Sequence, residues 1–437
     1  MRLRALPLIL VVLLSAQPAM AYRPEDTPRR RLDAATADAR SHSAARGATL
    51  GMLVLREGVP IMRVNKDAAM IPASLTKLAT TVAAIHRFGP EHRMPTIVRA
   101  SGGSPSRPAT LIMVGRGDPT FSTEAYRRKR YLPDPDDRIQ RPAFASGSAT
   151  VEGLAALVKA AGVRSVVGDL IADESWFDTD RVPDGWPASY FSGDPQSGYH
   201  SALVVNEGRT DLTRRNIHPR PALQAANTLR SALRSQGITI GGSVRIGRTP
   251  DGSREVARVE SPPMAEIVDF INRYSANFQA DMVFKALGAR YGNRGSYAEA
   301  ERIVVSSLRA FGIPTEGLDL KDGSGLSRSG RLTATTIAYT LEAIRTRPKL
   351  RSVWESLPVS GGPGTLERRL NRWPTRGNLR AKTGLLRYVR GLAGIVRDRD
   401  GAYIVFASMY NRGRSAIALG IPLDLLTLSF AYHPFGR

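Results

Sequence analysis

The sequence predicts an α+β fold in which an antiparallel sheet carries helices on both faces and is interrupted by a long inserted α/β module. Apolar residues at helical spacing in 74–88 and 263–287 predict helices. β-Rich runs near both ends of the chain predict the strands of the sheet. Residues 93–261 change to short β-rich runs, glycine turns and modest helices, so residues 48–92 and 262–437 are expected to form one discontinuous domain around an inserted one.

Residues 1–21 have the layout of a secretory signal peptide. Two arginines precede an apolar stretch at 6–16, and the small residues 19–21 offer a cleavage site before Tyr22. The apolar stretch is shorter than the roughly 20 residues that a spanning helix needs. We therefore expect cleavage, and a mature protein that is periplasmic or secreted. Residues 22–47 are rich in Arg, Ala, Asp and Pro without periodicity, which favours a mobile lead-in.

Order is expected to begin near Ala48. Residues 48–55 and 61–64 are β-rich and flank a polar turn that contains glycine and proline, which predicts a hairpin. The helix over 74–88 carries an apolar stripe and ends at a Gly-Pro pair. Ser74 therefore lies at a helix N-terminus, where free backbone N–H groups and the positive end of the helix dipole favour an oxyanion.

The insert contains a weak internal repeat. Residues 151–161 are helical in pattern and lead into an extended run at 163–171, and residues 229–236 lead likewise into 238–246. Two occurrences do not make a repeat array. We interpret this region as a module with layers of its own.

The C-terminal part returns to long elements. A helix is expected over 263–287, with Ser275 and Asn277 within or beside it. Residues 388–396 and 402–409 flank a charged turn and predict two antiparallel strands, the first of which follows a Lys-Thr-Gly motif at 382–384.

The composition of the chain limits the kinds of partner that we expect it to bind. There is no cysteine, so packing rather than disulfides must stabilise an exported protein of 437 residues. The formal net charge of +23 favours electrostatic association with the anionic polymers and lipids of a cell envelope, and nucleic acid is a poorer candidate outside a cell. The most basic cluster, at 127–130, is followed by an acidic turn and is interpreted as a solvated loop.

Three short motifs together predict an activated serine. They are Ser74-Leu-Thr-Lys77, Ser275-Ala-Asn277 and Lys382-Thr383-Gly384. A serine hydroxyl needs a neighbouring base in order to attack, and Lys77 lies on the same helix face as Ser74. Alone, the first motif is more simply a helix N-cap. The three motifs in this order, on a helix start, a later helix and a strand start, favour nucleophilic catalysis.

The sequence lacks the motifs that other catalytic mechanisms require. There is no G-x-S-x-G elbow, and the six histidines are scattered without an obvious triad base. No H-E-x-x-H motif and no cysteine pair are present, so we expect neither a protein-bound metal nor a cofactor. The glycine-rich segment 115–120 lacks the third glycine of a nucleotide loop and is interpreted as a turn.

With these motifs the chain resembles the D-alanyl-D-alanine carboxypeptidase/endopeptidase family, the class C low-molecular-mass penicillin-binding proteins. The resemblance spans most of the mature chain and includes the segments 115–120, 201–207, 261–263, 322–328 and 364–366. Class A β-lactamases place the first two catalytic motifs much closer together. The resemblance implies a β-lactamase/transpeptidase-like catalytic domain and a long insert.

The resemblance also implies roles for the motif residues. Ser74 would attack the carbonyl between two D-alanines and form an acyl-enzyme. Lys77 would act as its base, which requires a neutral amine, and Lys382 could be a second cation that lowers the pKa of Lys77. Ser275 would relay a proton to the leaving amine, and Asn277 would hold the substrate amide.

The Lys-Thr-Gly strand is implied to bind substrate. Lys382 and Thr383 would hold the terminal carboxylate, Gly384 belongs to the same binding strand, and the backbone N–H groups of Ser74 and Leu385 would form the oxyanion hole. Leu385 departs from the family, which commonly has a small hydroxyl residue here. A side-chain hydrogen bond to the substrate carboxylate would be lost.

The implied partners are peptidoglycan stem peptides, with β-lactam antibiotics as covalent inhibitors. Arg328 either faces the bound peptide side chain or is a surface arginine, and the balance of carboxypeptidase and endopeptidase activity stays open. Two alternatives remain. One is a β-lactamase or esterase on the same scaffold, which the lack of an E-x-x-x-N segment at class A spacing disfavours; the other is a catalytically silent wall-binding protein that uses the basic surface.

Overall fold

A five-stranded antiparallel sheet unites the two ends of the chain. The structure, a computed structural model, describes residues 28–131 and 144–432, and the predicted signal peptide lies outside them. The strand order is β10-β11-β12-β1-β2. These strands are β1 (Thr49–Arg56), β2 (Val59–Val64), β10 (Arg380–Leu386), β11 (Val389–Arg397) and β12 (Tyr403–Asn411). The predicted N-terminal hairpin and the predicted pair of C-terminal strands are both confirmed by their antiparallel registers.

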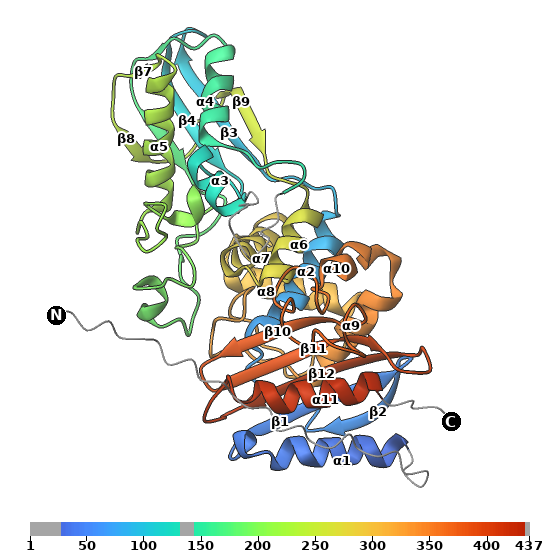
Figure 1. Cartoon of the computed structure of the whole chain (residues 1–437). Helices are drawn as coiled ribbons and strands as arrows, with labels where there is room; N and C mark the ends of the chain where they lie inside the picture. Colours follow the sequence, from blue (N-terminus) through green and yellow to red (C-terminus); the bar gives the residue numbers. More distant parts are fainter. Residues whose placement is uncertain (1–27, 132–143, 433–437) are drawn as a thin grey trace, which may run out of the picture.

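Helices cover both faces of this sheet (Figure 1). Strand β1 shows why, because Leu53 and Leu55 enter one apolar core while Met52 and Val54 enter another. Alternate side chains of a strand point to opposite faces, and both sets here are apolar. One core is covered by α2 (Thr76–Phe88), α6 (Met264–Tyr274), α7 (Asn277–Tyr291), α8 (Tyr297–Arg309), α9 (Ala334–Thr346) and α10 (Arg351–Ser356).

The opposite face is covered by α1 (Pro28–Ser41) and α11 (Gly420–Tyr432), which lie side by side (Figure 1). The expectation of a mobile lead-in at 22–47 is therefore wrong for residues 28–41, which form this helix, and residues 22–27 lie outside the described residues. Leu32 and Ala39 are buried in the same core as Phe430, and the Tyr410 hydroxyl donates to the Ala39 carbonyl at 2.8 Å. The sequence did not reveal this helix because its few apolar residues are mostly alanines between arginines and aspartates.

A second sheet lies between residues 95 and 260, with the order β8-β6-β4-β3-β9. Its strands are β3 (Pro95–Gly103), β4 (Pro108–Gly115), β6 (Leu170–Asp173), β8 (Val244–Ile246) and β9 (Arg254–Glu260). It packs with α4 (Val151–Ala160) and α5 (Pro221–Ser235) around an apolar core of its own, away from the first sheet (Figure 1). The weak internal repeat in the insert corresponds to two parallel strand pairs. The strands after α4 pair with the strands after α5: β5 (Ser165–Val166) with β7 (Thr239–Ile240), and β6 with β8.

The basic cluster at 127–130 is not a solvated loop. It belongs to α3 (Glu124–Tyr131), where Glu124 pairs with Arg127 and Arg128 across one helical turn. Arg130 is instead drawn inward, and its Nε lies 2.9 Å from the buried carboxylate of Glu207. The described residues also contain short 3-10 turns: η1 (Ser43–Ala45), η2 (Ala73–Leu75), η3 (Ala188–Phe191), η4 (Asn206–Gly208) and η5 (Pro348–Leu350).

Candidate active site

Ser74 lies in the 3-10 turn η2, directly before α2. Glycines in neighbouring segments let the backbone pass close to this turn. A Cβ on Gly325 would lie 1.9 Å from the Ala73 carbonyl oxygen, and one on Gly391 would lie 2.8 Å from the Leu75 side chain. The turn that carries Ser74 is thus held between the 322–328 segment and the edge of the first sheet.

Lys77 is fully buried one helical turn after Ser74. Its ammonium nitrogen donates to three oxygens: Ser74 Oγ at 2.9 Å, Asn277 Oδ1 at 2.9 Å and the Ser324 carbonyl at 2.6 Å. The Asn277 side chain and the Ser324 carbonyl hold the amine of Lys77 beside the Ser74 hydroxyl. An amine held there is placed to take the proton of that hydroxyl.

Burial is the main cause of the lowered pKa of Lys77. It lowers the pKa of Lys77 from 10.5 to about 8, while the carboxyls of Asp281 and Asp322 act in the opposite direction. Burial, with Lys77 nearby, also holds the pKa of Lys382 well below its ordinary value. Lys382 was expected to be a cation that could lower the pKa of Lys77, but desolvation is the leading cause for both lysines.

Ser275 and Asn277 lie at a break between two helices. The single helix expected over 263–287 is interrupted, because Ser275 ends α6 in the left-handed conformation, with φ at +56°, and α7 begins at Asn277. This break lets Asn277 Oδ1 meet Lys77, while its amide nitrogen donates to the Gln196 carbonyl of the insert at 3.1 Å.

Lys382 lies within β10, the edge strand of the first sheet. The motif leads into β11 as the sequence predicted, but the separate strand that carries it was not predicted. Its buried ammonium donates to Ser275 Oγ at 2.9 Å and to the Thr383 carbonyl at 3.0 Å. Gly384 follows in the same strand, where a Cβ would lie 3.0 Å from the Pro72 carbonyl. The glycine thus lets β10 approach the Ser74 turn.

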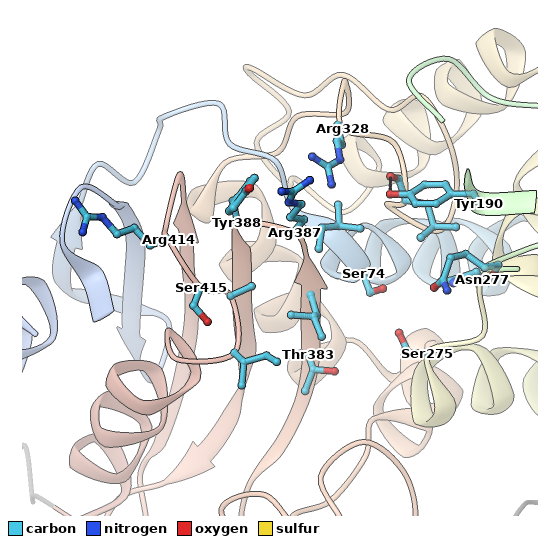
Figure 2. A pocket seen from close by; sticks show the side chains of 16 residues that line it. Ser74, Tyr190, Ser275, Asn277, Arg328, Thr383, Arg387, Tyr388, Arg414 and Ser415 are labelled. Carbon is cyan, nitrogen blue, oxygen red and sulfur yellow. Dashed lines mark hydrogen bonds between the residues drawn. The ribbon is translucent and has the colours of Figure 1, made fainter. Parts of the chain in front are cut away.

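A cleft of about 850 Å³ opens above these groups. Ser74, Ser275, Asn277, Thr383 and Leu385 line it, as does Arg328, and Figure 2 shows the labelled side chains around one space. Lys77 and Lys382 are buried behind this lining and act on it through the hydroxyls of Ser74 and Ser275.

Sequence reasoning missed two buried acids behind Lys77. Asp281 accepts from the backbone N–H groups of Gly323 at 2.9 Å and Ser324 at 2.8 Å, which holds the carbonyl that Lys77 contacts. Asp322 accepts from Trp186 Nε1 at 2.7 Å. Burial raises the pKa of both carboxyls. Asp281 stands one helical turn after Asn277, a spacing that could have pointed to it.

The insert also contributes to the cleft. Tyr190 and Gln196 line it, although nothing in their local sequence indicated a site. Tyr190 donates to the Leu326 carbonyl at 3.2 Å, which ties the insert to the 322–328 segment.

Across residues 28–131 and 144–432 no cluster of three or more metal-ligating side chains occurs. In the same ranges, no helix combines the length and the apolar character needed to cross a membrane.

The fold and the site define the protein's class. Penicillin-binding protein 4 (DacB) of Haemophilus influenzae has the same fold, with a TM-score of 0.74 over 91% of this chain and 97% of that chain at 21% identity. A predatory endopeptidase of Bdellovibrio bacteriovorus, solved with an immunity protein, is similar with a TM-score of 0.52 at 14% identity, covering 88% and 93% of the two chains. The predicted α+β class is confirmed, and the fold is that of a penicillin-binding protein.

The family follows from the sequence comparison. The model of the D-Ala-D-Ala carboxypeptidase 3 (S13) family matches residues 29–219 and 213–420, so the chain belongs to this family. A carboxypeptidase of Mycobacterium tuberculosis is 32% identical over 80% of this chain and 74% of its own length. A D-alanyl-D-alanine carboxypeptidase of Actinomadura sp. strain R39 is 28% identical over 98% and 89%. The chain is a peptidase, and the resemblance drawn from its motifs is confirmed.

Proposed function

We propose that this peptidase hydrolyses D-alanyl-D-alanine peptides of peptidoglycan through an acyl-enzyme on Ser74, and that β-lactams acylate the same serine. The single observation that carries the proposal is the 2.9 Å contact between Lys77 Nζ and Ser74 Oγ at the base of an open cleft. The names of the relatives and the family support the substrate class.

The proposed reaction begins with neutral Lys77. It takes the proton of Ser74 while Oγ forms a bond to the carbonyl carbon between the two D-alanines. The C–N bond then breaks, and the leaving amine receives a proton through Ser275, whose hydroxyl is held by Lys382. Water hydrolyses the ester and regenerates Ser74.

Substrate orientation is assigned to the walls of the cleft. Thr383 is proposed to hold the terminal carboxylate from the wall of the cleft, with Lys382 buried behind it, and Asn277 is proposed to hold the substrate amide. The backbone N–H groups of Ser74 and Leu385 are proposed to form the oxyanion hole. The Leu385 side chain is half exposed, so it offers the substrate apolar contact in place of a hydroxyl.

The proposed place of action is the periplasm or the outside of the cell. The signal-like residues 1–21 support an exported protein, and the net charge of +23 supports its attraction to an anionic envelope. Detection of Tyr22 as the N-terminal residue of protein purified from its native host tests the export. An intact N-terminus would contradict it.

Intact-mass spectrometry after incubation with benzylpenicillin tests the chemistry. We expect a stable mass increase of one penicilloyl group, absent from Ser74→Ala. Intact penicillin without an adduct would overturn the proposal in favour of a wall-binding protein. Hydrolysed penicillin without an adduct would instead indicate a β-lactamase.

A further inference from the structure

Helix α11 is apolar on its outer face as well as on the face that covers the sheet. Leu423, Leu426 and Phe430 are buried in the core beside the sheet. On the other side Ile421 and Leu425 are exposed to solvent, on the outside of the molecule beside α1 (Figure 1). A surface helix ordinarily carries polar side chains on its outer face, and a helix that is apolar on every side is usually buried. This face therefore indicates a partner that the described residues do not supply.

The exposed apolar surface extends beyond both ends of α11. Ile417 lies in the turn before the helix, four residues before Ile421, and 80% of it is exposed. At the far end Trp373, which is 66% exposed, packs edge-on against Tyr432 with 5.4 Å between the ring centres. Within the described ranges, Ile417 and Trp373 are the most exposed of the large apolar side chains. We call this surface the α11 face: Ile417, Ile421, Leu425, Tyr432 and Trp373.

Arginines border the α11 face. The guanidinium of Arg399 lies 5.6 Å from the ring centre of Tyr432 and 5.8 Å from that of Trp373. Arg372 directly precedes Trp373 in the chain and is exposed. Among the described residues neither arginine has a carboxylate partner, so both charges are available to a ligand.

The acids on α11 and beside Arg399 are already paired. Asp424, the one acid of α11, lies 2.6 Å from Arg369, and Asp400 lies 3.5 Å from Arg56. The neighbouring helix α1 adds four arginines and two aspartates. The surroundings of the α11 face therefore carry a net positive charge.

This combination fits the surface of an anionic membrane. Apolar side chains of a docked protein enter the boundary between lipid headgroups and acyl chains, and basic residues around them attract anionic headgroups. Tryptophan and tyrosine are enriched at the same depth. A second copy of this chain fits less well, because a two-fold interface would bring the same arginines together without acids to neutralise them.

We propose that the α11 face docks the protein onto an anionic lipid surface. Ile417 also belongs to the lining of the catalytic cleft, so a docked molecule holds one rim of the cleft close to the headgroups. Peptides near the membrane are then within reach of Ser74. Lipid binding uses none of the catalytic groups, so this inference and the proposed function can fail separately.

Co-sedimentation with lipid vesicles tests the proposal. The wild type is expected to bind vesicles of mixed phosphatidylglycerol and phosphatidylcholine, and to bind vesicles of phosphatidylcholine alone only weakly. Added salt should weaken the binding without abolishing it, because salt screens the arginines but not the apolar contact.

The apolar contribution is measured with two matched variants. Ile421→Gln/Leu425→Gln should lower the affinity for the mixed vesicles about tenfold, because two apolar side chains are lost from the contact. Leu157→Gln/Val167→Gln is the control in the insert and should bind like the wild type. Leu157 and Val167 are 45% and 56% exposed, against 47% for Leu425 and 54% for Ile421. The midpoint of thermal unfolding checks that each variant keeps its fold.

The charge contribution is measured in the same way. Arg372→Gln/Arg399→Gln should lower the affinity about tenfold at low salt and less at high salt, whereas Arg372→Lys/Arg399→Lys should keep it. Arg164→Gln/Arg234→Gln removes two exposed charges from the insert and should leave binding unchanged.

Trp373 gives a local signal of the docked state, because it is the one mostly exposed residue among the four tryptophans. Brominated phosphatidylcholine quenches tryptophan emission on contact. Vesicles that contain it should quench part of the emission of the bound wild type. In Trp373→Phe this quenched part should disappear.

Three results would overturn the inference. The first is no binding to the mixed vesicles. The second is an equal loss of binding in the α11 variants and the insert variants, which would reflect net charge alone. The third is a dimer in sedimentation velocity that Ile421→Gln/Leu425→Gln converts to a monomer, without vesicle binding, which would assign the α11 face to a second copy of the chain. The benzylpenicillin adduct is expected with each of these results, since it tests the proposed function alone.

Discussion

At the scale of single residues, the chemistry depends on the environment of Lys77. A lysine in water is almost fully protonated at neutral pH and cannot take a proton from serine. Here burial removes water from the ammonium, and the three oxygens around it fix its direction. Asp281 and Asp322 keep its pKa from falling further. The pKa of Lys77 is thus close to neutral pH, as the proposed role of general base requires.

The pH dependence of acylation checks this environment. Because the pKa of Lys77 is lowered to about 8, the neutral fraction grows as the pH rises through that value. We expect the benzylpenicillin acylation rate to increase about tenfold from pH 7 to pH 9 and then to level off. Stopped-flow or quenched-flow mass spectrometry measures it. A rate that stays flat over this range would contradict Lys77 as the base.

At the scale of elements, the site depends on close backbone approaches. The segment 322–328 passes the Ser74 turn at Gly325, whose φ of +80° and lack of a Cβ are both needed. The break between α6 and α7 separates Ser275 from Asn277, so that each contacts a different lysine. These contacts join segments that are far apart in the sequence.

Gly325→Ala tests the importance of this approach. The added Cβ would meet the Ala73 carbonyl at 1.9 Å, so the turn that carries Ser74 must move. We expect the acylation rate to fall at least about tenfold, since small displacements of a nucleophile are costly. Gly377→Ala is the matched control, because Gly377 also has a positive φ, +71°, but open space around it. It should lose about 1 kcal/mol of stability and keep its acylation rate. Equal acylation in both variants would contradict the argument.

At the scale of the whole molecule, a buried hub joins the insert to the catalytic helices. Glu207 of the insert accepts from Arg130 at 2.9 Å and Tyr131 at 2.9 Å, and from Gln279 of α7 at 3.0 Å. Burial raises the pKa of Glu207, but Arg130 and Arg214 outweigh it and hold that pKa well below its ordinary range. Gln279, the member of this hub on α7, is two residues after Asn277. The insert therefore helps to position the site.

Glu207→Gln should destabilise the protein, because it leaves buried cations without their counter-charge. We expect the free energy of unfolding to fall by about 3 to 5 kcal/mol in urea denaturation at neutral pH. Glu316→Gln, at an exposed position, is the control. Since the folded-state pKa of Glu207 is depressed, its contribution is present above the unfolded-state pKa and is lost as the pH falls below about 4. The difference between wild type and variant should shrink there, and a difference that grows on acidification would contradict the charge argument.

The family, the main strands and helices, and the motif residues proposed for catalysis could all be predicted from the sequence alone. Those features are local: a Lys three residues after a Ser, a Lys-Thr-Gly run, and apolar spacings of two or three to four residues. They can be read without knowing which segments meet. The α1 helix was not predicted because its burial depends on α11, which lies at the other end of the chain.

The surroundings of those residues follow from the tertiary packing and could not be predicted from the sequence. The lowered pKa of Lys77 and the backbone contacts of the buried Asp281 both arise from segments distant in sequence. Desolvation and charge interactions depend on distances through space, which a linear pattern does not contain. The motifs therefore specify which groups can react, and the packing around them sets whether a proton can move and which substrates fit.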